Sequence, residues 1–196
     1  MTLSPDPSTL RAFIAIEIPE ELRRAILRTR DKLRMTDAHV SWVPDPNLHL
    51  TLVFLGDIST DTADLLSAAL KKGLRNTCPF RVDVQGVGAF GRPGAPRIVW
   101  AGTDNAEPVT ALYDSIAANV RELGIPVEDR PFHPHITMGR VRSSRGRKAL
   151  VEAMANHADT TFGSMEVYGV ALMRSILKLK GVAYERLHEA RFVSQD

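Results

Sequence analysis

Two short segments of the chain have the same form, His-x-Thr-x with an apolar residue at each x: His49-Leu-Thr51-Leu and His135-Ile-Thr137-Met. Side chains two apart in a β-strand project from the same face, so each segment is expected to present an imidazole beside a hydroxyl. Two imidazoles across a cleft suit general acid and base catalysis near neutral pH, because one can be protonated while the other is not. Threonine hydroxyls can donate hydrogen bonds to phosphate oxygens, so the predicted substrate is a phosphodiester.

The bland interpretation of a single strand histidine is a half-buried structural residue, and only the matched pairing with threonine favours catalysis. His133 precedes Pro134 and is better suited to ordering the entry to the second motif than to proton transfer. A zinc site built from His49, His133 and His135 would need a further ligand, and no carboxylate stands at a useful spacing. We therefore expect neither a metal nor another cofactor. Surface or capping roles suffice for the remaining histidines, which are His39, His157 and His188.

The motifs fall in segments with strand-like alternation, and helical periodicity marks the segments between them. In residues 47–55, alternation places His49, Thr51 and Val53 on one face and Leu48, Leu50, Leu52 and Phe54 on the other. We expect helices over about 20–34, 60–72, 107–123 and 145–157. We expect strands over about 12–18, 47–55, 80–90, 97–101 and 135–141, around 165–177, and over 182–188.

The second half of the chain repeats the order of the first. His49 and His135 lie 86 positions apart. The same shift carries helices 20–34 and 60–72 to 106–120 and 146–158, and strands 80–90 and 97–101 to 166–176 and 183–187, which overlap elements expected independently. The pattern predicts two similar lobes about an approximate two-fold axis. We expect a flexible leader at 1–10 followed by one domain at 11–196.

The overall charge is small: 25 Lys and Arg against 23 Asp and Glu give a formal net charge of +2. Such a chain lacks the strongly basic character of a duplex-DNA binder, so any nucleic-acid contact must be local. Arg140 ends the second motif strand and is a candidate phosphate ligand, with the equally weighted alternative of a solvated basic run. Arg97 and Arg130 are poorer candidates. The basic run consists of Arg140, Arg142, Arg145, Arg147 and Lys148.

Composition also bears on location. The single cysteine, Cys78, excludes an intramolecular disulfide and a cysteine-based zinc site, and favours a reducing compartment. No apolar run approaches the roughly 18 residues that span a bilayer, and the N-terminal residues lack a secretory pattern. We expect a cytoplasmic protein that does not enter membranes. Aromatic residues in or beside strands could stack a nucleobase, although core packing is the more common role for them: Trp42, Phe54, Trp100 and Phe132.

These residues resemble a known family, the two-histidine (2H) phosphoesterases, and within it the RNA 2′,3′-cyclic phosphodiesterases, also called 2′-5′ RNA ligases or LigT-like proteins. The paired His-x-Thr-x motifs are the specific part of the resemblance. The supporting pattern runs over Arg11-Ala-Phe-Ile-Ala-Ile, Trp42-Val43, residues 49–56, Gly88-x-Phe90, Val99-Trp-Ala-Gly102, Phe132-His-Pro-His-Ile-Thr137, Leu172-x-x-Ser175 and Gly181-x-x-Tyr184. Met138 and Gly139 depart slightly from the family pattern, at the edge of the expected pocket.

The resemblance implies an α+β, bilobal fold in which antiparallel sheets line a central cleft and helices lie outside. It implies hydrolysis of a terminal 2′,3′-cyclic phosphate to a 2′-phosphomonoester, with reversible ATP-independent 2′-5′ ligation as a related activity. His49 would be the proton donor, His135 the proton acceptor, and Thr51 and Thr137 the phosphate ligands. Arg140 and Phe54 are further candidates for substrate binding. The implied partners are RNA 3′ ends with a cyclic phosphate, tRNA fragments among them, bound by a monomer.

Two alternatives stay open at the level of sequence. The first is a 2H phosphodiesterase that acts on small cyclic nucleotides or an ADP-ribose cyclic phosphate, which differs from the leading hypothesis in preferring mononucleotides to oligonucleotides. The second is a non-catalytic RNA-end binding module, which would bind tightly and form no product.

Overall fold

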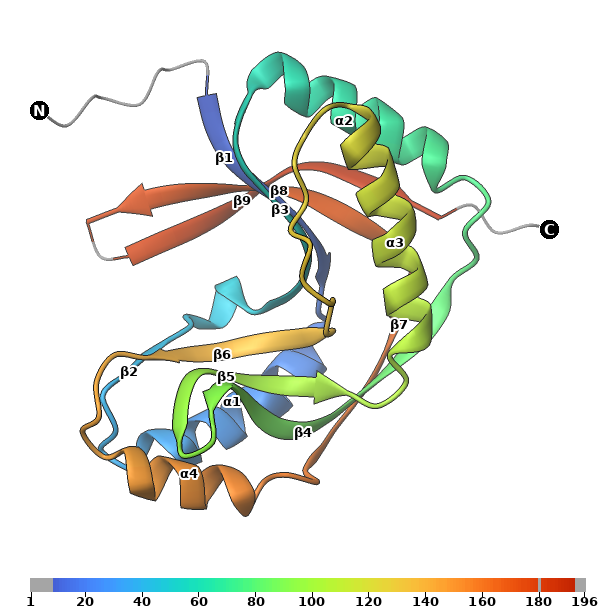
Figure 1. Ribbon diagram of the computed structural model, residues 1–196. Helices are drawn as coiled ribbons and strands as arrows, with labels where there is room; N and C mark the ends of the chain where they lie inside the picture. The colour runs from blue at the N-terminus through green and yellow to red at the C-terminus, as the bar shows by residue number, and fades with distance from the viewer. Residues whose placement is uncertain (1–8, 180, 193–196) are drawn as a thin grey trace, which may run out of the picture.

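The computed structural model describes residues 9–179 and 181–192, which form four α-helices, a 3-10 turn and nine strands (Figure 1). Helices α1 and α4 lie together on the outside of the lower half, whereas α2 and α3 lie together on the upper half. In chain order the elements are β1 (Thr9–Glu17), α1 (Glu20–Arg34), β2 (Val40–Trp42), η1 (Asp45–Asn47), β3 (His49–Ser59), α2 (Thr60–Gly73), β4 (Phe80–Arg92), β5 (Ala95–Thr103), α3 (Glu107–Glu122), β6 (His135–Val141), α4 (Arg147–Ala155), β7 (Thr161–Val167), β8 (Gly169–Lys178) and β9 (Gly181–Arg191).

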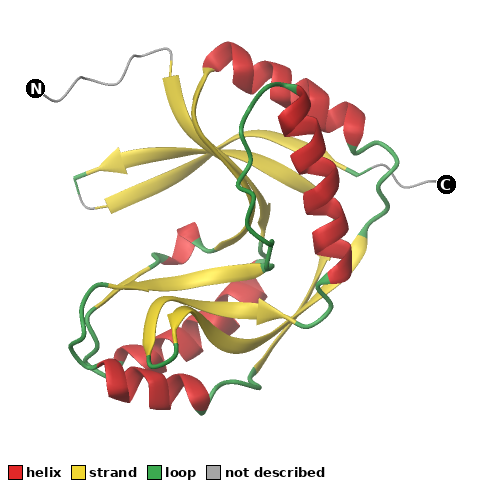
Figure 2. Cartoon of the chain, viewed as in Figure 1, coloured by secondary structure: helices red, strands yellow, loops and turns green. Residues whose placement is uncertain are grey.

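All strand pairs are antiparallel, and their order is β7-β4-β5-β6-β3-β1-β8-β9, with β2 paired to β6. The two expected sheets are therefore joined into one curled sheet (Figure 2). The junction between the two halves is the β3–β6 pair, in which Leu50 opposes Ile136. Each half of the sheet has its helices on the outside, which gives the expected α+β, bilobal architecture.

The predicted internal repeat is present in the structure. A shift of 86 positions carries β1 onto the range of β5, and it carries α1, β3 and α2 onto ranges that overlap α3, β6 and α4. Each lobe nevertheless takes strands from both halves of the chain. Strand β4 pairs with β5 in the lobe of the second motif, whereas β8 pairs with β1 in the lobe of the first. This exchange interlocks the two lobes.

Element boundaries differ from the sequence expectations in a few places. Thr9 and Leu10, which we expected in the leader 1–10, belong to β1 and oppose Ser59 and Ile58; residues 1–8 lie outside the described residues. The helix expected from 145 begins at Arg147, after Gly146 has taken the left-handed conformation at φ 65°. The segment around 165–177 holds parts of two strands, β7 and β8.

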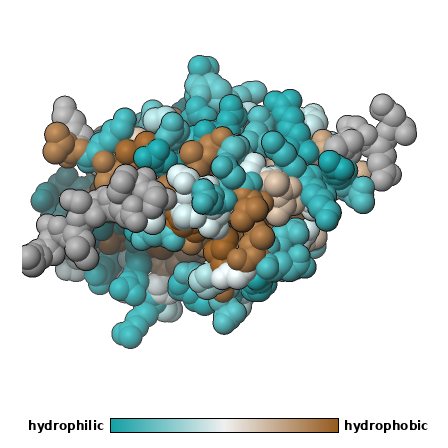
Figure 3. Space-filling view, turned by 90° about the horizontal axis from the view of Figure 1, so that it is seen from above, coloured by the Kyte–Doolittle hydropathy of each residue, from teal (hydrophilic) through white to brown (hydrophobic). Residues whose placement is uncertain are grey.

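The core lies between the sheet and the helices. Helix α1 buries Leu22, Ile26 and Leu33 on one face, as their helical spacing predicts. Leu50 and Ile136 of the central strand pair are fully buried. Seen from above (Figure 3), hydrophilic residues cover most of the face, and hydrophobic residues gather near its middle.

One glycine of β4 supports the packing beneath the second motif. Gly88 opposes Trp100, and a Cβ atom at Gly88 would lie 2.1 Å from Cη2 of that indole. Because both residues are held by the β4–β5 ladder, we expect Gly88→Ala to lower the free energy of unfolding by about 1–3 kcal/mol through overpacking.

Urea denaturation measures this change. Gly73→Ala is the matched control, because a Cβ there would meet only the end of the Asn119 side chain, which can move away. Equal stability of the Gly88→Ala variant and the wild type would show that the Trp100 indole can accommodate a methyl group at residue 88, which would contradict the tight packing described.

Candidate active site

The two motifs meet where the halves of the sheet join. Because Leu50 opposes Ile136 in an antiparallel pair, His49 lies across from Thr137 and Thr51 lies across from His135. All four motif side chains are half-buried, in contrast to Leu50 and Ile136. The alternation expected from the sequence therefore holds across both motifs.

A β-bulge follows each motif at the same position. In the β1–β3 ladder, Ala15 opposes Thr51 and Ile14 opposes Val53, so Leu52 is the extra residue. In the β5–β6 ladder, Trp100 opposes Thr137 and Val99 opposes Gly139, so Met138 is the extra residue. An extra residue inverts the alternation of the side chains beyond it.

The bulges decide where Phe54 and Arg140 point. Strict alternation places Phe54 on the apolar face with Leu50, and this expectation is wrong: the Phe54 side chain is 58% exposed and lines a cavity. Arg140 is likewise exposed and lines the same cavity. Because both bulges lie one residue after the threonine, the residue five positions after each motif histidine turns back to the histidine side.

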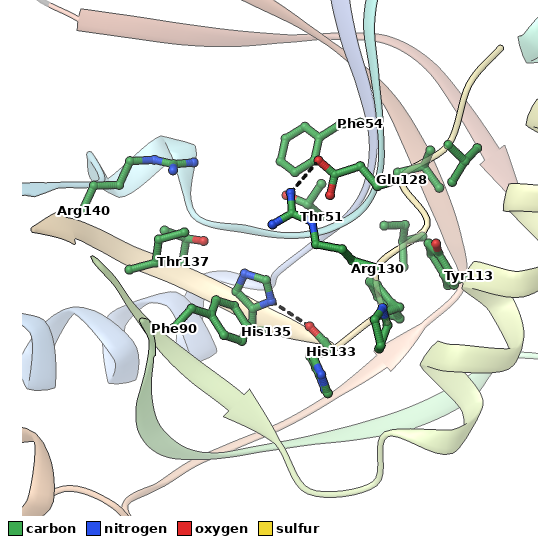
Figure 4. A pocket seen from close by; sticks show the side chains of 16 residues that line it. Thr51, Phe54, Phe90, Tyr113, Glu128, Arg130, His133, His135, Thr137 and Arg140 are labelled. Atoms are coloured by element: carbon green, nitrogen blue, oxygen red, sulfur yellow. Dashed lines mark hydrogen bonds and ion pairs between the residues drawn. The ribbon is translucent and has the colours of Figure 1, made fainter. Parts of the chain in front are cut away.

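The cavity has a volume of about 570 Å³ and is shown in Figure 4. Arg140 lies at one end and Tyr113 at the other, with His135 and Thr137 between them. The outer wall is aromatic, since the rings of Tyr113 and Phe132 stack with centroids 4.2 Å apart. Phe90 packs edge-on against the ring of His135, with centroids 4.8 Å apart.

Backbone carbonyls orient both motif histidines in the same way. The Nδ1 atom of His49 lies 2.8 Å from the carbonyl oxygen of Asn47, and Nδ1 of His135 lies 2.7 Å from that of His133. A carbonyl oxygen can only accept, so Nδ1 carries the hydrogen in both rings and Nε2 is the free nitrogen of the neutral form. The expected ordering role of His133 is consistent with this contact.

His49 is enclosed more tightly than His135. Its ring stacks on Phe13 at 4.8 Å and meets the edge of Tyr184 at 5.2 Å. Its Nε2 atom lies 2.9 Å from Oγ1 of Thr51, the hydroxyl of its own motif. The aromatic contacts fix the plane of the imidazole, and the threonine fixes the direction of Nε2.

The segment before the first motif ties the two lobes together. The side chain of Asn47 donates a hydrogen bond to the carbonyl oxygen of Val182 in β9, at 2.6 Å. The buried Arg30 of α1 donates to the carbonyl oxygen of Val43 and to the Asp45 carboxylate, which holds the turn before Asn47. The carbonyl that orients His49 is thus itself held in place from both sides.

Burial lowers the pKa of both motif histidines. For His49 the nearby charge of His135 adds to this effect, and the hydrogen bond to Asn47 opposes it. For His135 the charges of His133 and Arg140 add to the burial, and the carbonyl of His133 opposes them. Burial raises the pKa of Tyr184, against the charges of Arg140 and Arg11. Both imidazoles are therefore mainly neutral at pH 7 in the unliganded protein.

Of the other residues that the sequence singled out, some line the cavity and the rest have contacts elsewhere. Phe132 and Arg130 line the cavity, and Arg130 pairs with Glu128 at 3.0 Å. Trp42 packs over Gly139, where a Cβ would lie 2.8 Å from the indole, and Trp100 packs over Gly88. The remaining histidines have partners elsewhere, namely His39 with Ser143, His157 with Thr160 and His188 with Asp64.

Several site residues carried no functional prediction from the sequence. Tyr113 lies in a helix, and Glu128 lies in the loop before β6; nothing in their local sequence distinguishes them. Asn47, Phe13 and Tyr184 reach His49 from separate elements. Phe13 and Tyr184 both lie in segments of the family pattern, Arg11-Ala-Phe-Ile-Ala-Ile and Gly181-x-x-Tyr184, whereas nothing in the sequence pointed to Asn47.

No group of three or more His, Cys, Asp or Glu side chains among the described residues is arranged to hold a metal ion. None of the described helices is both long enough and apolar enough to cross a membrane.

The interlocked antiparallel lobes and the facing His-x-Thr motifs define a two-histidine phosphoesterase. Comparison with known proteins refines this class: residues 18–177 match the model of the 2′-5′ RNA ligase superfamily, and the chain belongs to that family. It is 35% identical over 175 residues to the RNA 2′,3′-cyclic phosphodiesterase of Methanothermobacter thermautotrophicus, covering 89% of this chain and 95% of that one. It is also 35% identical to the RNA 2′,3′-cyclic phosphodiesterase of Thermus thermophilus, covering 92% and 89%.

Solved structures agree with this assignment. The TT0787 protein of Thermus thermophilus superposes with a TM-score of 0.77 at 32% identity, covering 93% of this chain and 97% of that one. E. coli LigT complexed with 3′-AMP gives a TM-score of 0.79 at 26% identity, covering 95% and 99%.

The carbonyl contacts and the burial of the two imidazoles can be tested by NMR. We expect both motif histidines to be Nδ1–H tautomers when neutral and to titrate below the ordinary value of about 6.5. Addition of inorganic phosphate should raise both titration midpoints, because an anion beside Nε2 favours the imidazolium.

Nitrogen-15 spectra of the imidazole rings measure tautomer and midpoint together, and His49→Gln and His135→Gln assign the two signals. An Nε2–H tautomer at either ring, or a midpoint above 6.5 without phosphate, would contradict the described geometry.

Proposed function

We propose that the protein is an RNA 2′,3′-cyclic phosphodiesterase, which hydrolyses a terminal 2′,3′-cyclic phosphate to a 2′-phosphomonoester. The observation that carries the proposal is the pair of equivalent imidazoles that present Nε2 from two facing, repeat-related strands. The names of its relatives support the substrate class. An RNA 3′ end that carries a cyclic phosphate, including the ends of tRNA fragments, is the partner that follows.

The proposed reaction is an in-line displacement at phosphorus. Water attacks while His135 accepts its proton, the bond from phosphorus to O3′ breaks, and His49 protonates O3′ as it leaves. The product keeps the phosphate on O2′. The proton gained by His135 returns to His49 through solvent before the next cycle. The two histidines must act on opposite sides of the phosphorus, which suits their origin in opposite lobes.

Thr51 couples phosphate binding to the protonation of His49. When His49 is neutral, the Thr51 hydroxyl donates to Nε2 across the 2.9 Å contact. When His49 is protonated, Nε2 no longer accepts this hydrogen bond, so the Thr51 hydroxyl is free to donate to a phosphate oxygen and Nε2–H is available to O3′. The protonated acid and the prepared phosphate ligand therefore occur together. Thr137 supplies the corresponding hydroxyl in the second lobe.

Phe54 and Arg140 bind the rest of the terminal nucleotide in this proposal. Both occupy the fifth position after a motif histidine, and both line the cavity from opposite lobes. An exposed phenyl ring offers a stacking surface for a nucleobase, and the guanidinium can bind the phosphate or stack on the base. Arg140 also opposes protonation of His135 through its charge, which suits a proton acceptor.

Ligand binding prepares the acid in the same scheme. Both imidazoles are mainly neutral in the unliganded protein, whereas the proposed acid must carry a proton. The negative charge of the bound phosphodiester favours the imidazolium, so the substrate itself raises the pKa of His49. Reversible, ATP-independent 2′-5′ ligation would follow the same path with an RNA 5′-hydroxyl attacking phosphorus in place of water, and the reverse reaction would return the cyclic phosphate and the 5′-hydroxyl. A monomeric, cytoplasmic protein remains our expectation.

Substitution of each motif histidine tests the proposal. On an oligonucleotide that ends in a 2′,3′-cyclic phosphate, in excess EDTA, we expect His49→Asn and His135→Asn to lower kcat by about 10²–10⁴-fold, because each removes one proton-transfer group. His188→Asn is the matched control on the outer strand β9 and should retain activity. The product of the wild type should carry a 2′-phosphate.

Other results of this experiment would favour other functions. Full activity of either motif variant would contradict acid and base catalysis by this pair. Loss of wild-type activity in EDTA would indicate a metal-dependent reaction. Tight binding of the oligonucleotide without product would leave the protein as an RNA-end binding module, and a preference for cyclic mononucleotides would indicate a small-molecule phosphodiesterase.

A further inference from the structure

A second cavity adjoins the site. It lies where the end of β4, the beginning of β5, the end of β6 and the start of α4 meet. It has a volume of about 690 Å³, and four arginines line it: Arg92, Arg97, Arg142 and Arg147. The rest of its lining is glycine, alanine, proline, valine and serine, with no acidic residue. We call these four residues the arginine pocket.

The arginine pocket gathers positive charge that nothing in the described chain neutralises. Arg145 and Lys148, which belong to the same basic run, pair with Asp37 at 3.7 Å and Glu152 at 3.9 Å. None of the four pocket arginines has an ion pair or side-chain hydrogen bond with any described residue.

One donor in the pocket is buried without an acceptor. The Nε atom of Arg147 is buried and has no hydrogen-bond partner among the described residues. A buried unpaired donor on a charged group costs free energy, and so do like charges held around one cavity. An anion in the cavity would offset both costs, and the planar guanidinium favours phosphate oxygens among anions.

The two cavities follow one another along the same pair of strands. Arg140 lines the first cavity, and Val141 and Arg142 line the second; on β5, Ile98 lines the first and Arg97 the second. Ile98 and Arg140 are themselves opposed in the ladder. Arg142 lies seven residues beyond His135, which is about 20 Å along a strand. A phosphate group held by the histidines cannot reach the arginine pocket, whereas a chain of nucleotides can.

We propose that the arginine pocket binds the phosphodiester backbone of the RNA, a few nucleotides before the cyclic-phosphate end held by the two histidines. This inference rests on the proposed function and adds a second contact that selects oligonucleotides over mononucleotides. The RNA chain leaves the first cavity past Arg140 and enters the second beside Arg142. Arg97, which the sequence ranked as a poor phosphate ligand, contributes because β5 brings it beside the end of β6.

The test removes three exposed charges and keeps Arg147, whose Nε is buried. The variant is Arg92→Gln, Arg97→Gln and Arg142→Gln combined. Its matched control is Lys71→Gln, Lys72→Gln and Arg75→Gln combined, which makes the same charge change at exposed positions in and just after α2. Activity is measured on 2′,3′-cyclic AMP and on RNAs of two to ten nucleotides that end in a 2′,3′-cyclic phosphate.

We expect the arginine variant to lose about tenfold or more in kcat/KM on the ten-nucleotide RNA and to match the wild type on 2′,3′-cyclic AMP. The wild-type advantage should appear only above a minimum RNA length. The plot of log kcat/KM against log salt concentration should become shallower by about 2 for three lost phosphate contacts on a single strand. Equal losses on both substrates, or a loss no larger than that of the control, would overturn the inference.

Binding separates this inference from the proposed function. Fluorescence anisotropy of a labelled ten-nucleotide RNA with a 3′-phosphate needs no turnover, and the arginine variant should bind it about tenfold more weakly than the control. A wild type that turns over neither substrate would contradict the proposed function, while weakened binding in the arginine variant would still support the pocket. Unchanged binding together with normal turnover of 2′,3′-cyclic AMP would overturn the pocket and leave the proposed function intact.

Discussion

The opposition of Leu50 and Ile136 is the constraint on which the site depends. This pair joins the two halves of the sheet, and both side chains are fully buried. Burying the apolar residues of both motifs forces their histidines and threonines to the other side. The hydrophobic effect that closes the core therefore also brings together two imidazoles that lie 86 positions apart in the sequence.

The local pattern was enough to predict the motif strands, the outer helices and the internal repeat. It was not enough to predict the bulges at Leu52 and Met138, because a bulge is set by the register of a neighbouring strand. Strict alternation consequently placed Phe54 in the core. The contacts of Asn47 with Val182 and of Tyr184 with His49 join residues more than 130 positions apart, and no local pattern encodes them. The resemblance to a family supplied the proposed roles of the histidines, which periodicity alone could not assign.

The electrostatics of the cleft follow from unequal burial of charge. The imidazoles are enclosed, so their protonated forms are disfavoured, whereas Arg140 and three of the pocket arginines, Arg92, Arg97 and Arg142, are exposed to solvent. A phosphodiester reverses this balance, because its charge stabilises both the imidazolium and the arginines. The net charge of only +2 fits this arrangement, since Arg140 and the four pocket arginines supply positive charge locally. Binding and activation of the acid are then consequences of the same anion.

The pH dependence of kcat/KM tests most directly the central claim, that two buried imidazoles divide acid and base catalysis. This parameter reports the free protein, in which burial lowers the pKa of both histidines. The acidic limb reports protonation of the base, and the basic limb reports loss of the proton from the acid. The account predicts a bell-shaped profile with its maximum below pH 6.5, and the loss of one limb in each single-histidine variant. A profile that rises steadily from pH 5 to 9 would contradict it.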